Sequence, residues 1–214
     1  MNWTLEIVFR LLSGAAEQFG AVVDQGEPEL VGDRLYAEVW GEFQTVPTIE
    51  RPKRDLPNAV IAARLDGIPV LFGLLDESAD RADLGDALRR YRNQATIARS
   101  WLGANAQDLQ LFLVGPLGSA NDARWRDTAL QIEADDRVCR KLVWLPTSEP
   151  TVDGALLFLS RTFLATPWRN YATPSAQRLD QMSALPLPSE WIVVITDENL
   201  TGDALVASLV EVTE

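Results

Sequence analysis

Carboxylates, cations and the chain's single cysteine are packed together in the stretch DDRVCRKLVWLP, residues 135–146. Cys139 lies beside Arg137, Arg140 and Lys141, and neighbouring cations lower the pKa of a thiol and so make it more reactive. The alternative is that Cys139 opens a buried strand as a small apolar residue. An activated nucleophile normally needs a basic partner, and the chain contains no histidine, so we expect a structural Cys139.

Glu133, Asp135 and Asp136 suggest a second chemistry, because carboxylate oxygens are the ligands that Ca²⁺ and Mg²⁺ prefer. The same residues end a predicted helix and stand beside three cations, with which they can form solvated ion pairs. The sequence favours these ion pairs over a metal site.

Composition removes most other catalytic options from this 214-residue chain. The absence of histidine excludes Ser–His and Cys–His nucleophile pairs and histidine-containing metal sites. A single cysteine excludes an intrachain disulfide and a thiolate zinc site. Lys53 and Lys141 are the only lysines among 19 basic residues, and GPLGSAND lacks the Lys-Ser/Thr that completes a phosphate-binding loop. We therefore expect no catalytic residues, no resident metal and no cofactor.

One enzyme class stays open as an alternative, a divergent metal-dependent nuclease with a restriction-endonuclease-like fold. Asp66, Asp76 and Glu77 could supply the carboxylates that hold Mg²⁺ in such a site. The lysine that would orient the attacking water is missing, because LFGLLDES contains none. The sequence thus predicts at most a degenerate nuclease core.

Cations gather in two places in a chain whose formal net charge is −12. That charge repels phosphate backbones, so the chain as a whole is not expected to bind nucleic acid by its charge, although a local basic face stays open. A helix with arginines on its surface is suited to contact with phosphate or with an acidic partner, and the alternative is a solvated outer face, which is usual for charge runs on amphipathic helices. We expect partner contacts at two groups of residues: Arg89, Arg90, Arg92 and Arg99, and then Arg137, Arg140 and Lys141.

The elements that must position these residues follow from hydrophobic periodicity. Apolar residues recur at helical spacing in 3–23, 82–102, 121–137 and 154–168, and strand patterns occupy 35–43, 59–67, 68–77, 109–116 and 139–146. Asn121 or Asp122 is expected to cap its helix, and the proline-rich segment 45–59 is expected to be an exposed loop.

The fold class predicted from this order is α/β (α+β), a mixed sheet flanked by helices. We expect a single domain, 1–214, with its core at approximately 30–165 and a less regular C-terminal part at 166–214. No apolar stretch is long enough to span a membrane, and the N-terminal segment carries Glu6 and Arg10, which favours a folded helix over a secretion signal. A cytoplasmic location is the resulting expectation.

The central block, RRYRNQATIARSWLGANAQDLQLFLVGPLGS followed by WRDTALQIEADDRVCRKLVWLP, resembles the middle component of bacterial ABC-three-component conflict systems, the group that includes Lamassu-type anti-phage defence. The resemblance covers roughly residues 60–165 and carries no catalytic motif. It implies a non-catalytic subunit that links an SMC/Rad50-like ABC ATPase to an effector protein, with nucleic acid reached only through the complex. A further alternative is a regulatory module that binds a small molecule near Trp168 and Trp191.

Overall fold

A computed structural model describes residues 3–36, 48–78 and 81–165, together with Ala204. The chain divides into two compact units, Met1–Ala165 and Thr166–Glu214, and the description below concerns the first. The predicted C-terminal part 166–214, which contains Trp168 and Trp191, lies outside the described ranges apart from Ala204, as do residues 37–43 of the predicted strand 35–43. The helices of the described residues include none that is both long and apolar enough to cross a membrane.

A five-stranded mixed sheet organises the first unit, in the order β1-β4-β5-β6-β7. Its strands are β1 (Val23–Gln25), β4 (Ile61–Leu65), β5 (Ile68–Leu74), β6 (Gln110–Val114) and β7 (Arg140–Trp144). The pairs β1–β4 and β4–β5 are antiparallel, whereas β5, β6 and β7 run parallel. The predicted class, a mixed sheet flanked by helices, is therefore confirmed.

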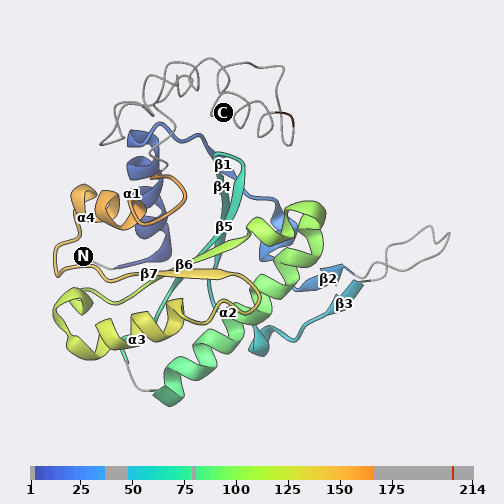
Figure 1. Cartoon of the computed structure of the whole chain (residues 1–214). Helices are drawn as coiled ribbons and strands as arrows, with labels where there is room; N and C mark the ends of the chain where they lie inside the picture. The colour runs from blue at the N-terminus through green and yellow to red at the C-terminus, as the bar shows by residue number, and fades with distance from the viewer. Residues whose placement is uncertain (1–2, 37–47, 79–80, 166–203, 205–214) are drawn as a thin grey trace. The chain divides into compact units, whose positions relative to one another are not determined.

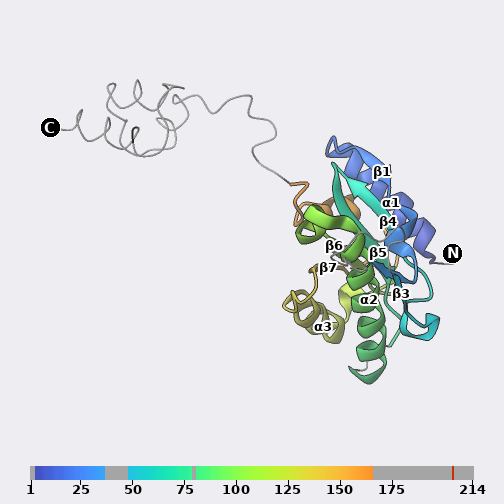
Figure 2. The same ribbon diagram turned by 90° about the vertical axis from the view of Figure 1, so that its right-hand side faces the viewer.

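Helices cover both faces of the sheet, as Figures 1 and 2 show. Helix α1 (Leu5–Gln18) and helix α4 (Val152–Leu159) pack on one face, and α2 (Arg81–Leu102) and α3 (Ala123–Glu133) pack on the other. The parallel strands are buried on both sides, which explains their nearly continuous apolar sequences. Side chains alternate between the two cores, so Phe112 faces α1 while Leu111 and Leu113 face α2 and α3.

Two helical crossovers, β5–α2–β6 and β6–α3–β7, connect the parallel strands. The loops that follow β5 and β6 therefore lie at one end of the sheet. The loop between α3 and β7 lies at the other end. Asp122 caps α3 by accepting a hydrogen bond from the backbone N–H of Arg124 at 2.9 Å, as one of the two predicted caps. Helix α3 ends at Glu133, four residues before its predicted end.

Several local predictions need correction. The segment 45–59 was expected to be a loop, but Thr48–Glu50 forms β3, which pairs antiparallel with β2 (Arg34–Tyr36) in a separate two-stranded sheet. A short 3-10 helix, η2 (Lys53–Asp55), follows it. Helix α4 covers Val152–Leu159, whereas the predicted helix covers 154–168. At its start the Thr151 hydroxyl accepts a hydrogen bond from the Gly154 N–H. The prediction missed β3 because a strand of three residues is too short to show a reliable hydrophobic periodicity.

The outer edge of β7 is met by a side chain from α3. Glu133 Oε1 accepts the backbone N–H of Val143 at 2.8 Å, and its other oxygen accepts Arg161 Nη2 at 2.6 Å. This carboxylate therefore joins α3, the last strand of the sheet and the segment after α4. Glu133 forms an ion pair, as the sequence favoured, but with a cation distant in the sequence.

Candidate functional site

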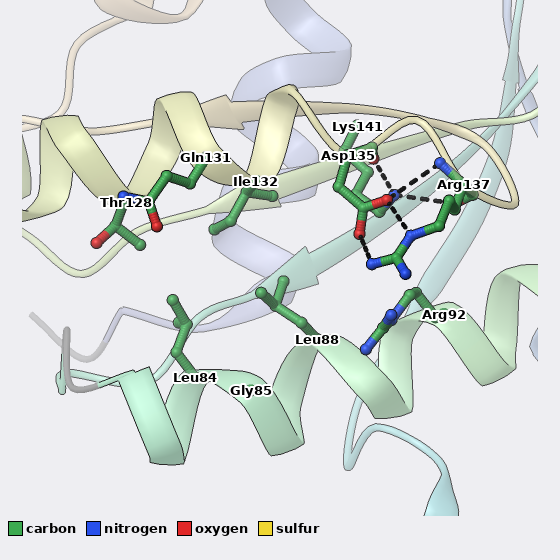
Figure 3. Close-up of a pocket in the computed structure, with 10 residues that line it drawn as sticks. All are labelled: Leu84, Gly85, Leu88, Arg92, Thr128, Gln131, Ile132, Asp135, Arg137 and Lys141. Carbon is green, nitrogen blue, oxygen red and sulfur yellow. Dashed lines mark hydrogen bonds and ion pairs between the residues drawn. The ribbon is translucent and has the colours of Figure 1, made fainter.

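A cavity of ≈ 390 Å³ lies between α2 and α3 on one face of the sheet, and we call it the α2–α3 cavity. Figure 3 shows side chains of α2 along one side, side chains of α3 along the other, and charged side chains gathered at one end. Its lining consists of Leu84, Gly85, Leu88, Arg92, Thr128, Gln131, Ile132, Asp135, Arg137 and Lys141.

The apolar part of the lining follows from helical spacing on two neighbouring helices. Leu84 and Leu88 are one turn apart on α2, and Thr128 and Ile132 are one turn apart on α3. Residues at this spacing share a helix face, so both pairs line the space between the helices. Gly85 widens this space, because a Cβ at that position would meet nothing within 4 Å.

Lys141 is the central charged group of the site and is only 3 % exposed. Its ammonium donates hydrogen bonds to the carbonyl oxygens of Asp135, of Arg137 at 3.0 Å and of Cys139 at 3.4 Å. Burial lowers the pKa of Lys141, and the positive charge of Arg92 nearby acts in the same direction. Because three carbonyls occupy its three donors, the amine holds the α3–β7 loop in place and is not a free nucleophile.

Asp135 and Arg137 form a two-point ion pair at the mouth of the cavity. Arg137 Nε lies 2.8 Å from Asp135 Oδ1, and Arg137 Nη2 lies 2.9 Å from Asp135 Oδ2. The hydrogen bond from Arg137 holds the pKa of the Asp135 carboxyl well below its usual range. The prediction that this acidic group pairs with neighbouring cations is confirmed for Asp135.

Cys139 is buried beside this network, directly before β7. Burial raises the pKa of its thiol to about 11, and the nearby positive charges of Lys141 and Arg99 only partly oppose that effect. A thiol of that pKa is almost entirely protonated near neutral pH, so the structural interpretation of Cys139 is the one that the geometry supports.

The seven cations predicted to contact partners are only partly brought together. Arg92, Arg137 and Lys141 line the α2–α3 cavity. Arg140 is exposed and alternates with Lys141 along β7, so its side chain leaves the opposite face of the sheet.

The other arginines of α2 point to separate neighbours. Arg89 pairs with Asp55 at 2.9 Å, and Arg99 donates a hydrogen bond to the carbonyl of Val138. Arg90 lines a different, smaller cavity together with Asp76 and Tyr91. Arg90 is rotated by about 100° around the helix from Arg89, and Arg89 and Arg99 are engaged by different neighbours although their spacing places them on one side of α2. The four arginines are therefore not a single patch, and a contact role for each stays a prediction.

The carboxylates of the nuclease alternative do not meet. Asp66 lies in the β4–β5 turn, where it accepts the Val22 N–H at 2.8 Å, whereas Asp76 and Glu77 follow the other end of β5. A seven-residue strand is about 20 Å long, so these groups cannot share one metal ion. Within residues 3–36, 48–78 and 81–165, no group of three or more cysteine or acidic side chains is arranged to hold a metal.

The sequence reasoning identified the cations of the cavity but missed its apolar walls. Leu84 and Leu88 fall within the predicted helix 82–102 and Ile132 within the predicted helix 121–137, but nothing in one helix indicates where its neighbour leaves a gap. The usable signal would have been Gly85, a glycine inside a long helix that lines the cavity and leaves open space where a side chain would be.

Residues 72–167 match the family described as ABC-three component (ABC-3C) system Middle Component 1. Neither the curated proteins nor the solved structures yielded a match. The family match confirms the resemblance to middle components, and the matched range contains every residue that lines the α2–α3 cavity.

Proposed function

We propose that this chain, whose residues 72–167 match the middle components of ABC-three component systems, is a non-catalytic subunit linking an SMC/Rad50-like ABC ATPase to an effector protein in bacterial anti-phage defence. The matched segment carries the proposal, since it holds both helices of the α2–α3 cavity and the cations at its end. In this role the subunit works in the cytoplasm and reaches nucleic acid only through the complex.

The chemistry of the site is suited to holding a partner. The buried ammonium of Lys141 is fixed by backbone carbonyls, the Cys139 thiol has a raised pKa, and the Asp135 carboxylate is paired with Arg137. These groups stabilise a surface with a defined shape and leave no activated nucleophile or base among themselves. A rigid sheet with helices on both faces is a suitable support for such a surface.

Co-expression with the ATPase and the effector from the same gene cluster tests the proposal. We expect the three proteins to elute together in size-exclusion chromatography, and we expect omission of this chain to separate the other two. Stable assembly of ATPase and effector in its absence, or failure of this chain to join either of them, would contradict a linking role.

The nuclease alternative is tested with the purified chain alone. We expect no cleavage of double- or single-stranded DNA in Mg²⁺ or Mn²⁺, because Asp66 lies at the opposite end of β5 from Asp76 and Glu77. Cleavage that disappears in Asp76→Ala would show a catalytic activity and would overturn the non-catalytic assignment.

A further inference from the structure

The two ends of the α2–α3 cavity differ: one end is uncharged, with Thr128 and Gln131 beside apolar side chains, and the charged side chains gather at the other (Figure 3). Leu84, Leu88 and Ile132 contribute the apolar side chains, whereas Arg92 and Arg137 lie at the charged end. A ligand that fits both ends carries an apolar group followed by an anionic group.

Among the three cations that line the cavity, Arg92 is the one whose guanidinium has no hydrogen-bonding partner in the described part of the chain. Lys141 uses its donors on three carbonyls, and Arg137 is engaged by Asp135. Within the described part of the chain, the Arg92 guanidinium makes no hydrogen bond and no ion pair. A guanidinium offers two parallel N–H donors, which match the two oxygens of a carboxylate.

Charge complementarity identifies the class of partner. Three cations and one carboxylate line the cavity, although the whole chain has a formal net charge of −12. A locally positive surface attracts acidic segments, whereas the overall net charge of −12 opposes the association of further copies of the same chain.

We infer that the α2–α3 cavity binds an acidic peptide segment of a partner protein in which an apolar side chain is followed by a carboxylate. The apolar side chain enters between Leu84, Leu88 and Ile132, and the carboxylate pairs with Arg92. This inference rests on the proposed function and adds to it the docking site and the chemistry of the segment that it receives.

Gly85→Trp tests the cavity without requiring loss of any existing contact. A side chain at position 85 meets open space, and replacing a helical glycine favours the helix. Gly14→Trp is the matched control, because Gly14 lies inside α1 on the other face of the sheet and also has no atom within 4 Å of a built Cβ. We expect Gly85→Trp to weaken binding of the partner about tenfold or more, while Gly14→Trp binds like the wild type.

Arg92→Glu tests the charged end independently. We expect a similar loss of affinity with a normal circular dichroism spectrum and unfolding transition. If the wild-type complex forms and both Gly85→Trp and Arg92→Glu bind normally, the docking site is wrong while the proposed function stands. If the wild-type chain binds neither partner, the proposed function and the docking site both fail.

Cross-linking identifies the occupant. In Gly85→Cys the new thiol is exposed while the native Cys139 is buried, so a maleimide–benzophenone label is directed to the cavity. Irradiation of the labelled complex should join it to a partner peptide with a carboxylate next to apolar residues. Cross-links to a basic segment, to DNA or to a second copy of this chain would overturn the inference.

Discussion

The ring of Tyr91 on α2 occupies the space that a side chain on Gly73 would need. A Cβ built on Gly73 would overlap the Tyr91 ring, and the Tyr91 hydroxyl donates a hydrogen bond to the carbonyl of Leu74 at 2.8 Å. Helix α2 is thereby held against β5 at one point, both by shape and by a polar contact. The position of α2 also sets one wall of the α2–α3 cavity.

Gly73→Ala should therefore destabilise the protein. Overpacking a well-filled core costs about 1–3 kcal/mol, because the ring or the strand must move. Guanidinium unfolding followed by tryptophan fluorescence would measure the loss. Gly14→Ala and Gly85→Ala are the controls, and we expect each to raise the free energy of unfolding by about 0.5–1 kcal/mol. A neutral Gly73→Ala would show that α2 is not fixed at this point.

Cys139 should react slowly with thiol reagents in the folded protein. A rise in its pKa from 9.0 to about 11 lowers the thiolate fraction near pH 8 by about 100-fold, and burial restricts access further. The measurement is the rate of alkylation by iodoacetamide at pH 8, in native buffer and in guanidinium. Because Cys139 is the only cysteine, the signal has a single source. Equal rates in both conditions would contradict a buried, protonated thiol.

Asp135 should stabilise the fold in a pH-dependent manner. The pKa of its carboxyl in the folded state is lowered, chiefly by the hydrogen bond from Arg137. Its contribution is therefore fully present above the unfolded pKa of about 3.9, and it is lost as the pH falls through the lower folded value. We expect Asp135→Asn to be less stable than the wild type at pH 7, with a difference that shrinks below about pH 4. Denaturation at a series of pH values provides the test, and a constant difference would exclude this ion pair as its source.

Arg89 and Arg92 should respond differently to charge reversal although they lie on the same helix. In the wild type, Asp55 and Asp86 both pair with Arg89. Arg89→Glu should lower the free energy of unfolding, because it places a negative charge beside these two carboxylates. Arg92 has no such partner among the described residues, so Arg92→Glu should change stability by no more than about 0.5 kcal/mol. Unfolding at low and high salt separates the two, because salt screens the repulsion in Arg89→Glu.

The sequence predicted the central part of the fold because its periodic signals are long. The 22-residue helix α2 and the apolar strands β5, β6 and β7 were placed almost to their ends. The strands β1 and β3, with three residues each, were missed because pairing partners rather than local pattern define them. The Asp122 cap was predictable, since a carboxylate before a helical segment has a local role.

The site was only partly predictable, for reasons that are also physical. Lys141, Arg137 and Arg92 were selected by charge, but their meeting depends on α2 and α3 lying side by side across parallel strands. The separate directions of Arg89, Arg90 and Arg99 depend on partners distant in the sequence, such as Asp55 and Val138. Residue type therefore indicated which side chains could bind an anion, and only the packing of the helices decides which of them share a cavity.

The Glu133 carboxylate protects the border of the sheet at β7 against pairing with strands of other molecules. Because Glu133 accepts the outward Val143 N–H, a foreign strand approaching β7 would have to displace that carboxylate and would meet its charge. At the opposite border, β1 offers only three residues. Within the described residues, neither border of the five-stranded sheet is therefore a good template for the addition of a strand from another molecule.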